Sequence, residues 1–303
     1  MKKIIFILAF LLLTTTVDCY GFWVWSAKTG NWVNPVYRIF DTAQEQFDWA
    51  KQYFDDADYR KAIFEFKKVI KKFRKSKHAA EAKFYIALSY EKLGKFQRAF
   101  KGYEEVIKLY PLNERLEEIA EREYMIGEKF FEQRKYDLSM KIFKQSLTNV
   151  PYGKVSDVVQ YKIGLCLLKL GDYDEAYDEF KKMAENYGFS TYVDDAFYSL
   201  GLCSFKISLR VKDYDQGLVD RAVEDLEFFL RRYQTSDYVP EAQSLLDKLI
   251  HKKAKRLYIV AQFYEKQKKQ YAAIKYYEEL IYSYAKTSWA KKARPKLERL
   301  RKN

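Results

Sequence analysis

Apolar and polar residues follow the period of an amphipathic helix along most of the chain. In residues 80–110 the apolar positions recur every three or four residues on both sides of Gly94. Glycine tolerates the left-handed conformation that ends a helix, and Pro111 cannot continue the second helix. The pattern therefore predicts two helices joined by a tight turn, followed by a break.

The same ten-residue phrase returns along the chain. It reads ADYRKAIFEF, GKFQRAFKGY, RKYDLSMKIF and GDYDEAYDEF, starting at Ala57, Gly94, Arg134 and Gly171. Its sixth residue is small each time, at Ala62, Ala99, Ser139 and Ala176, with separations of 37, 40 and 37 residues. A near-constant period of roughly 20–50 residues is typical of stacked repeats.

The pattern predicts six helix pairs, near residues 41–75, 77–111, 114–150, 156–188, 191–234 and 238–285, and then a terminal helix. The fifth pair has a longer predicted turn over residues 207–220, and no strand-type alternation is found. We therefore predict an all-α fold, a single superhelical solenoid over residues 41–303 in which each pair buries a face against its neighbours.

The joins between pairs share a second pattern, in which a hydroxyl residue is followed by a ring two positions later and an alanine six positions later. The four copies are SKHAAEA, STYVDDA, SDYVPEA and TSWAKKA, starting at Ser76, Ser190, Ser236 and Thr287. The hydroxyl groups are predicted to cap helix N-termini. His78 takes the ring position of the first copy, so we expect it to pack against the repeats and not to bind a metal.

The first 21 residues have the pattern of an export signal. Two lysines precede an apolar run from Ile4 to Leu13, which is shorter than the roughly 20 residues that a membrane span needs. Two processing routes fit: cleavage before Cys19 with lipid attached to its sulfur, or ordinary cleavage after Gly21. Either route predicts that the protein leaves the cytoplasm.

Residues 22–40 form a tryptophan-rich segment without helical periodicity, which contains Trp23, Trp25 and Trp32. Exposed indole rings lose favourable burial, so we expect the segment to pack along the first repeats, or against a partner or a membrane interface.

The net charge of +13 is unevenly distributed. Residues 251–303 hold 16 Lys and Arg against 4 Asp and Glu, whereas residues 19–250 hold 37 of each sign. This end is a candidate docking surface for an acidic partner domain or for anionic lipid, or a solvated face; nucleic acid is not expected for an exported protein. Its candidate residues are Lys252, Lys253, Lys255, Arg256, Lys291, Lys292 and Arg294.

Motifs of catalysis are missing from the sequence, which has only two histidines, no glycine-rich phosphate loop and no nucleophile elbow. We predict no catalytic, cofactor-binding or metal-binding residues and no enzyme activity. Cys166 and Cys203 lie 37 residues apart and are interpreted as buried core residues, with a disulfide between them left open.

The glycine and aromatic turn followed by alanine resembles the tetratricopeptide repeat over nearly all of the chain after Asp41. The blocks AVEDLEFFLRRYQTSDYVPEA and AQFYEKQKKQYAAIKYYEELIYSYAKTSWAKKA resemble the outer-membrane assembly lipoproteins of the BamD type. The residues in register with that family are Phe263, Tyr264, Tyr271, Ala272, Ala273, Tyr284 and Thr287.

The BamD-type resemblance implies a non-enzymatic scaffold on the periplasmic side of the outer membrane. Its partners would be a β-barrel insertase and the periplasmic domains of that insertase, in the assembly of outer-membrane β-barrel proteins. The alternative function is a tetratricopeptide-repeat adaptor of another envelope complex, in division, secretion or peptidoglycan maintenance.

Overall fold

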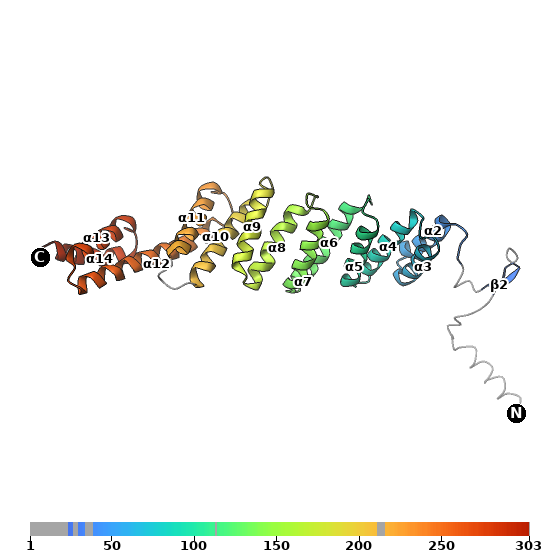
Figure 1. The fold of residues 1–303 in the computed structure, drawn as a ribbon, viewed down its shortest axis with the longest axis horizontal. Coiled ribbons are helices and arrows are strands. Elements are labelled where there is room, and N and C mark those ends of the chain that lie inside the picture. Colours follow the sequence, from blue (N-terminus) through green and yellow to red (C-terminus); the bar gives the residue numbers. More distant parts are fainter. Residues whose placement is uncertain (1–23, 27–29, 34–38, 113, 211–215, 303) are drawn as a thin grey trace, which may run out of the picture. The chain divides into compact units, whose positions relative to one another are not determined.

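The structure is a computed structural model that describes residues 24–26, 30–33, 39–112, 114–210 and 216–302 (Figure 1). The chain divides into two compact units, residues 1–113 and 114–303. The prediction of one array over residues 41–303 therefore stays a prediction, and each unit is described by itself.

The first unit contains a short hairpin and two helix pairs. The strands are β1 (Val24–Ser26) and β2 (Asn31–Val33), and the helices are α2 (Ala43–Asp55), α3 (Tyr59–Lys72), α4 (His78–Lys92) and α5 (Phe96–Leu109). The strands pair antiparallel, with Trp25 opposite Trp32. The sequence analysis did not find these strands, because three-residue strands are too short to show alternation.

The described residues of the second unit form helices and the turns that join them (Figure 1). Its helices are α6 (Leu116–Glu132), α7 (Tyr136–Asn149), α8 (Ser156–Leu170), α9 (Tyr173–Asn186), α10 (Val193–Arg210), α11 (Gln216–Arg232), α12 (Val239–Lys266), α13 (Gln270–Ser283) and α14 (Ser288–Lys302). Apart from the hairpin, the predicted all-α fold of helix pairs is confirmed for the part of the chain that the structure describes.

The turn inside a helix pair needs a residue with positive φ. Gly94 and Gly171 supply it with φ of 69° and 91°. At the matching turns Ala57, Arg134 and Lys268 adopt φ of 60°, 58° and 56° although they carry a Cβ. The left-handed conformation costs a residue with a Cβ about 1–2 kcal/mol, so the fold imposes this geometry even where the sequence disfavours it.

Small residues let the two helices of a pair approach closely. The small residues of the repeated phrase, Ala62, Ala99, Ser139 and Ala176, are all fully buried, and so are Ala222 and Ala273 in the second helices of the fifth and sixth pairs. The Ser139 hydroxyl donates a hydrogen bond to the Gly127 carbonyl across the α6–α7 interface, 2.8 Å away. The repeated small residue is therefore the position at which the two helices of a pair come into close contact.

Successive pairs are joined by contacts between aromatic rings. The ring at each join lies against a ring from the first helix of the pair before it. The centroid distances are 5.3 Å for Phe47–His78, 5.6 Å for Tyr161–Tyr192, 4.4 Å for Tyr198–Tyr238 and 5.2 Å for Tyr258–Trp289. His78 is buried, so its predicted packing role is confirmed.

The hydroxyl residues at the joins act differently from the capping prediction. Ser76, Ser190 and Ser236 accept a hydrogen bond from the amide two residues later, at 3.1–3.4 Å, upstream of the helix start. Thr287 accepts from the amide of Ala290 at 3.2 Å, in the first turn of α14. These three serines therefore stabilise the turn before the helix, and among the four hydroxyls Thr287 alone lies directly at a helix start.

The fifth and sixth pairs contain long helices, and those of the fifth pair are longer than the turn predicted over residues 207–220 allows. Most of the predicted long turn is helical, since α10 continues through Arg210 and α11 begins at Gln216. Helix α12 runs unbroken for 28 residues, because no glycine or proline interrupts it after Pro240. Its first half joins the core formed with α11, and its second half joins the core formed with α13 and α14.

Candidate partner-binding surfaces

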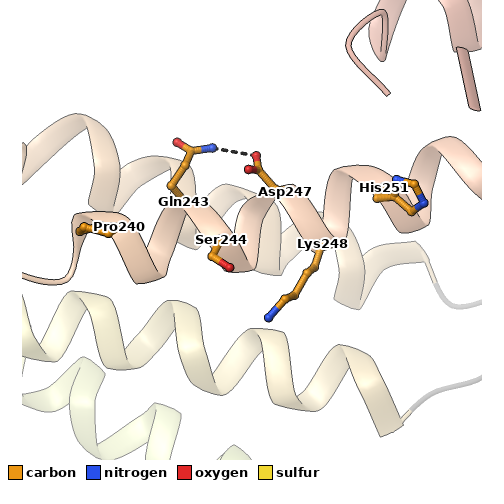
Figure 2. Close-up of a pocket in the computed structure, with 6 residues that line it drawn as sticks. All are labelled: Pro240, Gln243, Ser244, Asp247, Lys248 and His251. Atoms are coloured by element: carbon orange, nitrogen blue, oxygen red, sulfur yellow. Dashed lines mark hydrogen bonds between the residues drawn. The ribbon is translucent and has the colours of Figure 1, made fainter. Parts of the chain in front are cut away.

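Helix α12 carries a shallow depression of about 540 Å³ along one face (Figure 2). All six lining residues, from Pro240 to His251, belong to this one helix, and Gln243 donates a hydrogen bond to Asp247 at 2.9 Å. A depression without an opposing wall does not enclose a small molecule. The described residues also contain no group of three or more His, Cys, Asp or Glu placed to hold a metal ion.

The predicted basic surface divides into two parts, and the first part holds α12 in place. The Lys252 ammonium donates to the Ser208 carbonyl at 3.1 Å, near the end of α10. The Lys253 ammonium lies 2.6 Å from the Asp220 carboxylate of α11. Burial disfavours the charged ammonium, but the hydrogen bond and charge attraction from Asp220, together with the interaction with Tyr284, outweigh burial and raise the pKa of Lys253. Arg256 is half-buried in a hollow shared by α11, α12 and α13.

The second part is exposed and consists of Lys255, Lys291, Lys292 and Arg294. A contact between α12 and α14 brings these residues into one neighbourhood, because the Trp289 indole donates a hydrogen bond to Nε2 of His251 at 2.9 Å. Lys255 follows His251 by four residues and shares its helix face, while the Lys292 ammonium lies 4.6 Å from the centre of the Trp289 ring. Lys255 and Lys292 lie beside this aromatic contact, and Lys291 and Arg294 are exposed at other positions of α14.

Three other cations at this end, Lys296, Arg299 and Arg301, are already paired with carboxylates. Glu265 of α12 accepts a hydrogen bond from the Tyr277 hydroxyl at 2.8 Å and pairs with Lys296 at 3.4 Å and with Arg299. Burial alone would raise the pKa of Glu265, but these donors outweigh burial and lower it. Arg301 pairs with Glu278 at 2.6 Å. Counting charges along the sequence therefore overstates how much of the basic end is available to a partner.

The N-terminal aromatic segment is described only in part, since Cys19 and Trp23 lie outside the described residues. The Trp25 and Trp32 rings meet edge to face across the strand pair, with centroids 5.8 Å apart. They remain 53% and 63% exposed, more than we expect for rings packed along the first repeats. Two large rings thus present apolar surface to solvent.

The sequence analysis missed a concentration of positive charge in the first unit. Residues 59–77, which comprise α3 and the turn after it, hold nine Lys and Arg and a single Glu, a net charge of +8. The sum over residues 19–250 hides this stretch because acidic residues elsewhere cancel it. The net charge summed over a window of about 20 residues that is moved along the sequence reveals this stretch.

A model of the YfiO family, described as outer membrane lipoprotein, matches residues 116–300, which is more than half of the chain. The chain belongs to the YfiO family. The YfiO match begins at α6 and ends within α14, so it contains the exposed cations of α12 and α14 and leaves out α2–α5. A tetratricopeptide repeat model matches residues 81–113. The predicted tetratricopeptide resemblance is confirmed, and a BamD-type role stays a prediction.

Comparison with solved structures finds distant likenesses to tetratricopeptide and other proteins. YrrB, a TPR protein with an unusual peptide-binding site, is 17% identical over 67% of this chain and 92% of its own, with a TM-score of 0.39. The MamA protein is 20% identical over 64% of this chain and 96% of its own, with a TM-score of 0.36. PilW, a type IV pilus biogenesis factor, is 16% identical over 84% and 99%, with a TM-score of 0.32. At these identities and TM-scores the likenesses carry no argument about function.

No curated protein matches the sequence of this YfiO-family chain. Among the described helices, none combines the length and the apolar character that crossing a membrane requires. Family membership makes the chain a tetratricopeptide repeat protein of an outer membrane lipoprotein family.

Proposed function

We propose that this YfiO-family protein is a non-enzymatic periplasmic scaffold that binds protein partners during the assembly of outer-membrane β-barrel proteins. The observation that carries the proposal is the family match over residues 116–300, which contains the exposed cations at the end of the second unit. Stacked helical repeats generate extended surfaces suited to protein partners, and the BamD-type resemblance names a β-barrel insertase and its periplasmic domains as those partners.

The docking surface of this proposal is the exposed group Lys255, Lys291, Lys292 and Arg294. Clustered exposed charge accelerates the encounter with an oppositely charged partner and favours one orientation. Lys252, Lys253 and Arg256 hold in place the helix that carries Lys255. Lys252 and Lys253 bind α10 and α11, and Arg256 lies in the hollow beside them.

The N-terminal end serves attachment in this proposal. A lipid on Cys19 would anchor the chain to the inner face of the outer membrane, and the exposed Trp25–Trp32 pair would lie at the membrane interface or against a partner. Amphipathic rings are favoured at such interfaces. The intact mass of protein from the membrane fraction of its host tests the anchor: a lipid on Cys19 supports it, and an unlipidated chain cleaved after Gly21 contradicts it.

Capture of the insertase tests the docking surface. We compare the wild type with the triple variant Lys255→Glu, Lys291→Glu, Lys292→Glu, which leaves the buried contacts of α12 untouched. The control carries Lys141→Glu, Lys144→Glu and Lys169→Glu, which change the same charge at exposed positions elsewhere in the second unit.

We expect the first variant to lose insertase capture at least tenfold and the control to keep it, with equal thermal stability of both proteins. Equal capture by both variants contradicts the docking surface. Co-purification of septal, secretion or cell-wall components without an insertase contradicts the assembly role and favours the adaptor alternative.

A further inference from the structure

The first unit contains a groove of about 420 Å³ between α3 and α5, with α4 along its floor. The groove lies outside the residues that the YfiO model matches, so family membership says nothing about its use. It includes part of the charge concentration in residues 59–77.

Cations from two helices form the rims of the groove. Lys67 and Lys71 lie four residues apart on α3, and Arg98 and Lys101 lie three residues apart on α5, so each pair shares a helix face. All four side chains are exposed.

A further lysine in the groove is already neutralised. The Lys83 ammonium lies 2.7 Å from the Glu105 carboxylate, and Glu105 is the one carboxylate among the described lining residues. The groove therefore presents four rim cations whose charge no lining acid balances.

The floor between the rims is apolar. Ile70, Ile86 and Tyr90 are half-buried there, and the Arg98 guanidinium lies 5.8 Å from the centre of the Tyr90 ring. Gly102 brings α5 close to α4, since an added Cβ would lie 2.8 Å from the Cβ of Ala87. The apolar floor on α4 therefore lies between the two rims, and the close packing of α5 against α4 fixes the α5 rim beside it.

We propose that this groove binds an acidic segment of a partner protein, with carboxylates along both rims and an apolar side chain on the floor. Charge complementarity selects an acidic ligand, and the recessed apolar floor selects a peptide over an anionic membrane surface. A flat surface would contact the rims and leave the floor in water. This inference extends the proposed scaffold role. It rests on that role in one respect only, which is that the chain binds protein partners.

The test uses the full chain and a fluorescein-labelled peptide of sequence EELEELFEELEE, whose binding is followed by fluorescence anisotropy. Three comparison peptides replace Glu by Gln, Glu by Lys, or Leu and Phe by Ser. The groove variant is Lys71→Glu with Lys101→Glu. The matched control is Lys75→Glu with Lys95→Glu, which changes the same charge at exposed positions of the same unit outside the groove. Lys71→Arg with Lys101→Arg keeps the charge.

We expect the groove variant to bind the acidic peptide about tenfold more weakly than wild type, and the control and arginine variants to bind within about twofold. The Gln, Lys and Ser peptides should each bind at least about fivefold more weakly. Equal losses in the groove and control variants, or an unchanged Kd for the Ser peptide, overturn the proposal.

Phosphatidylglycerol vesicles form the second arm of the experiment. Vesicle binding that the groove variant abolishes, without binding of the acidic peptide, overturns the proposal in favour of a membrane surface. Insertase capture by the wild-type chain separates this proposal from the proposed function. In the wild type, insertase capture without binding of the acidic peptide refutes the groove alone, and peptide binding without insertase capture refutes the insertase role alone.

Discussion

The backbone of Gly164 in α8 lies directly against the ring of Phe180 in α9. A Cβ added at Gly164 would lie 2.6, 2.8 and 2.9 Å from Cε1, Cδ1 and Cζ of Phe180. Carbon atoms normally approach to about 3.5–4.0 Å, so the ring would have to move by about 1 Å. Phe180 is fully buried and packs on Tyr161 with centroids 5.6 Å apart, which leaves the ring little room to move.

Two effects of Gly164→Ala oppose each other. Alanine in place of glycine stabilises a helix interior by about 1 kcal/mol, whereas overpacking a core costs about 1–3 kcal/mol. We expect packing to win, with a net loss of about 1 kcal/mol in the free energy of unfolding. For a unit of this size that is a fall of about 2–4 °C in Tm.

Thermal unfolding by circular dichroism measures the effect in Gly164→Ala, in Phe180→Leu and in the double variant. Because leucine leaves space beside position 164, the alanine should cost less in the leucine background than in the wild type. The corresponding Gly127→Ala should cost more, since its Cβ would lie 2.3 Å from the ring of Phe143. A rise in Tm for Gly164→Ala, or strictly additive effects in the double variant, would refute the packing argument.

Three further predictions concern single side chains. The pKa of Glu265 is lowered in the folded chain, so its contacts stabilise the fold above its ordinary pKa of 4.5 and are lost as the pH falls through the folded value; Tyr277→Phe should cost about 1 kcal/mol in urea unfolding at pH 7 and less at pH 4. Lys268→Gly relieves a positive φ of 56° and should raise the free energy of unfolding by about 1 kcal/mol, whereas Lys268→Ala should not. Burial raises the pKa of Cys166 to about 11 and of Cys203 to about 12, so iodoacetamide at pH 8 should label neither thiol until the chain is unfolded; peptide mapping that finds native labelling contradicts this.

The helix pairs could be predicted because their signals are local. Gly94 and Gly171 adopt the positive φ that their turn positions require, and the buried small residues fall where the repeated phrase places them. The hairpin at Trp25 and Trp32 could not be predicted in this way, since its strands are too short to show a period.

The surfaces were harder to predict because the partners of a surface charge come from distant parts of the sequence. Periodicity places Lys252 and Lys253 on one helix, but it does not show that Ser208 and Asp220 lie within hydrogen-bond distance of them. The groove beside Lys71 likewise depends on which helices meet at its rims. Sequence therefore predicts the repeat better than it predicts which face of the repeat is available.

The unbroken helix α12 makes the end of the second unit a mechanical lever. Its first half packs through Ala242 and Leu249, and its second half packs through Ala254 and Ala261. At about 1.5 Å per residue its 28 residues extend for about 42 Å. A turn between the two halves would act as a hinge and absorb displacement. Because no turn separates the two halves, a displacement of α12 beside Trp289 would be transmitted along the helix to the core that its first half forms with α11.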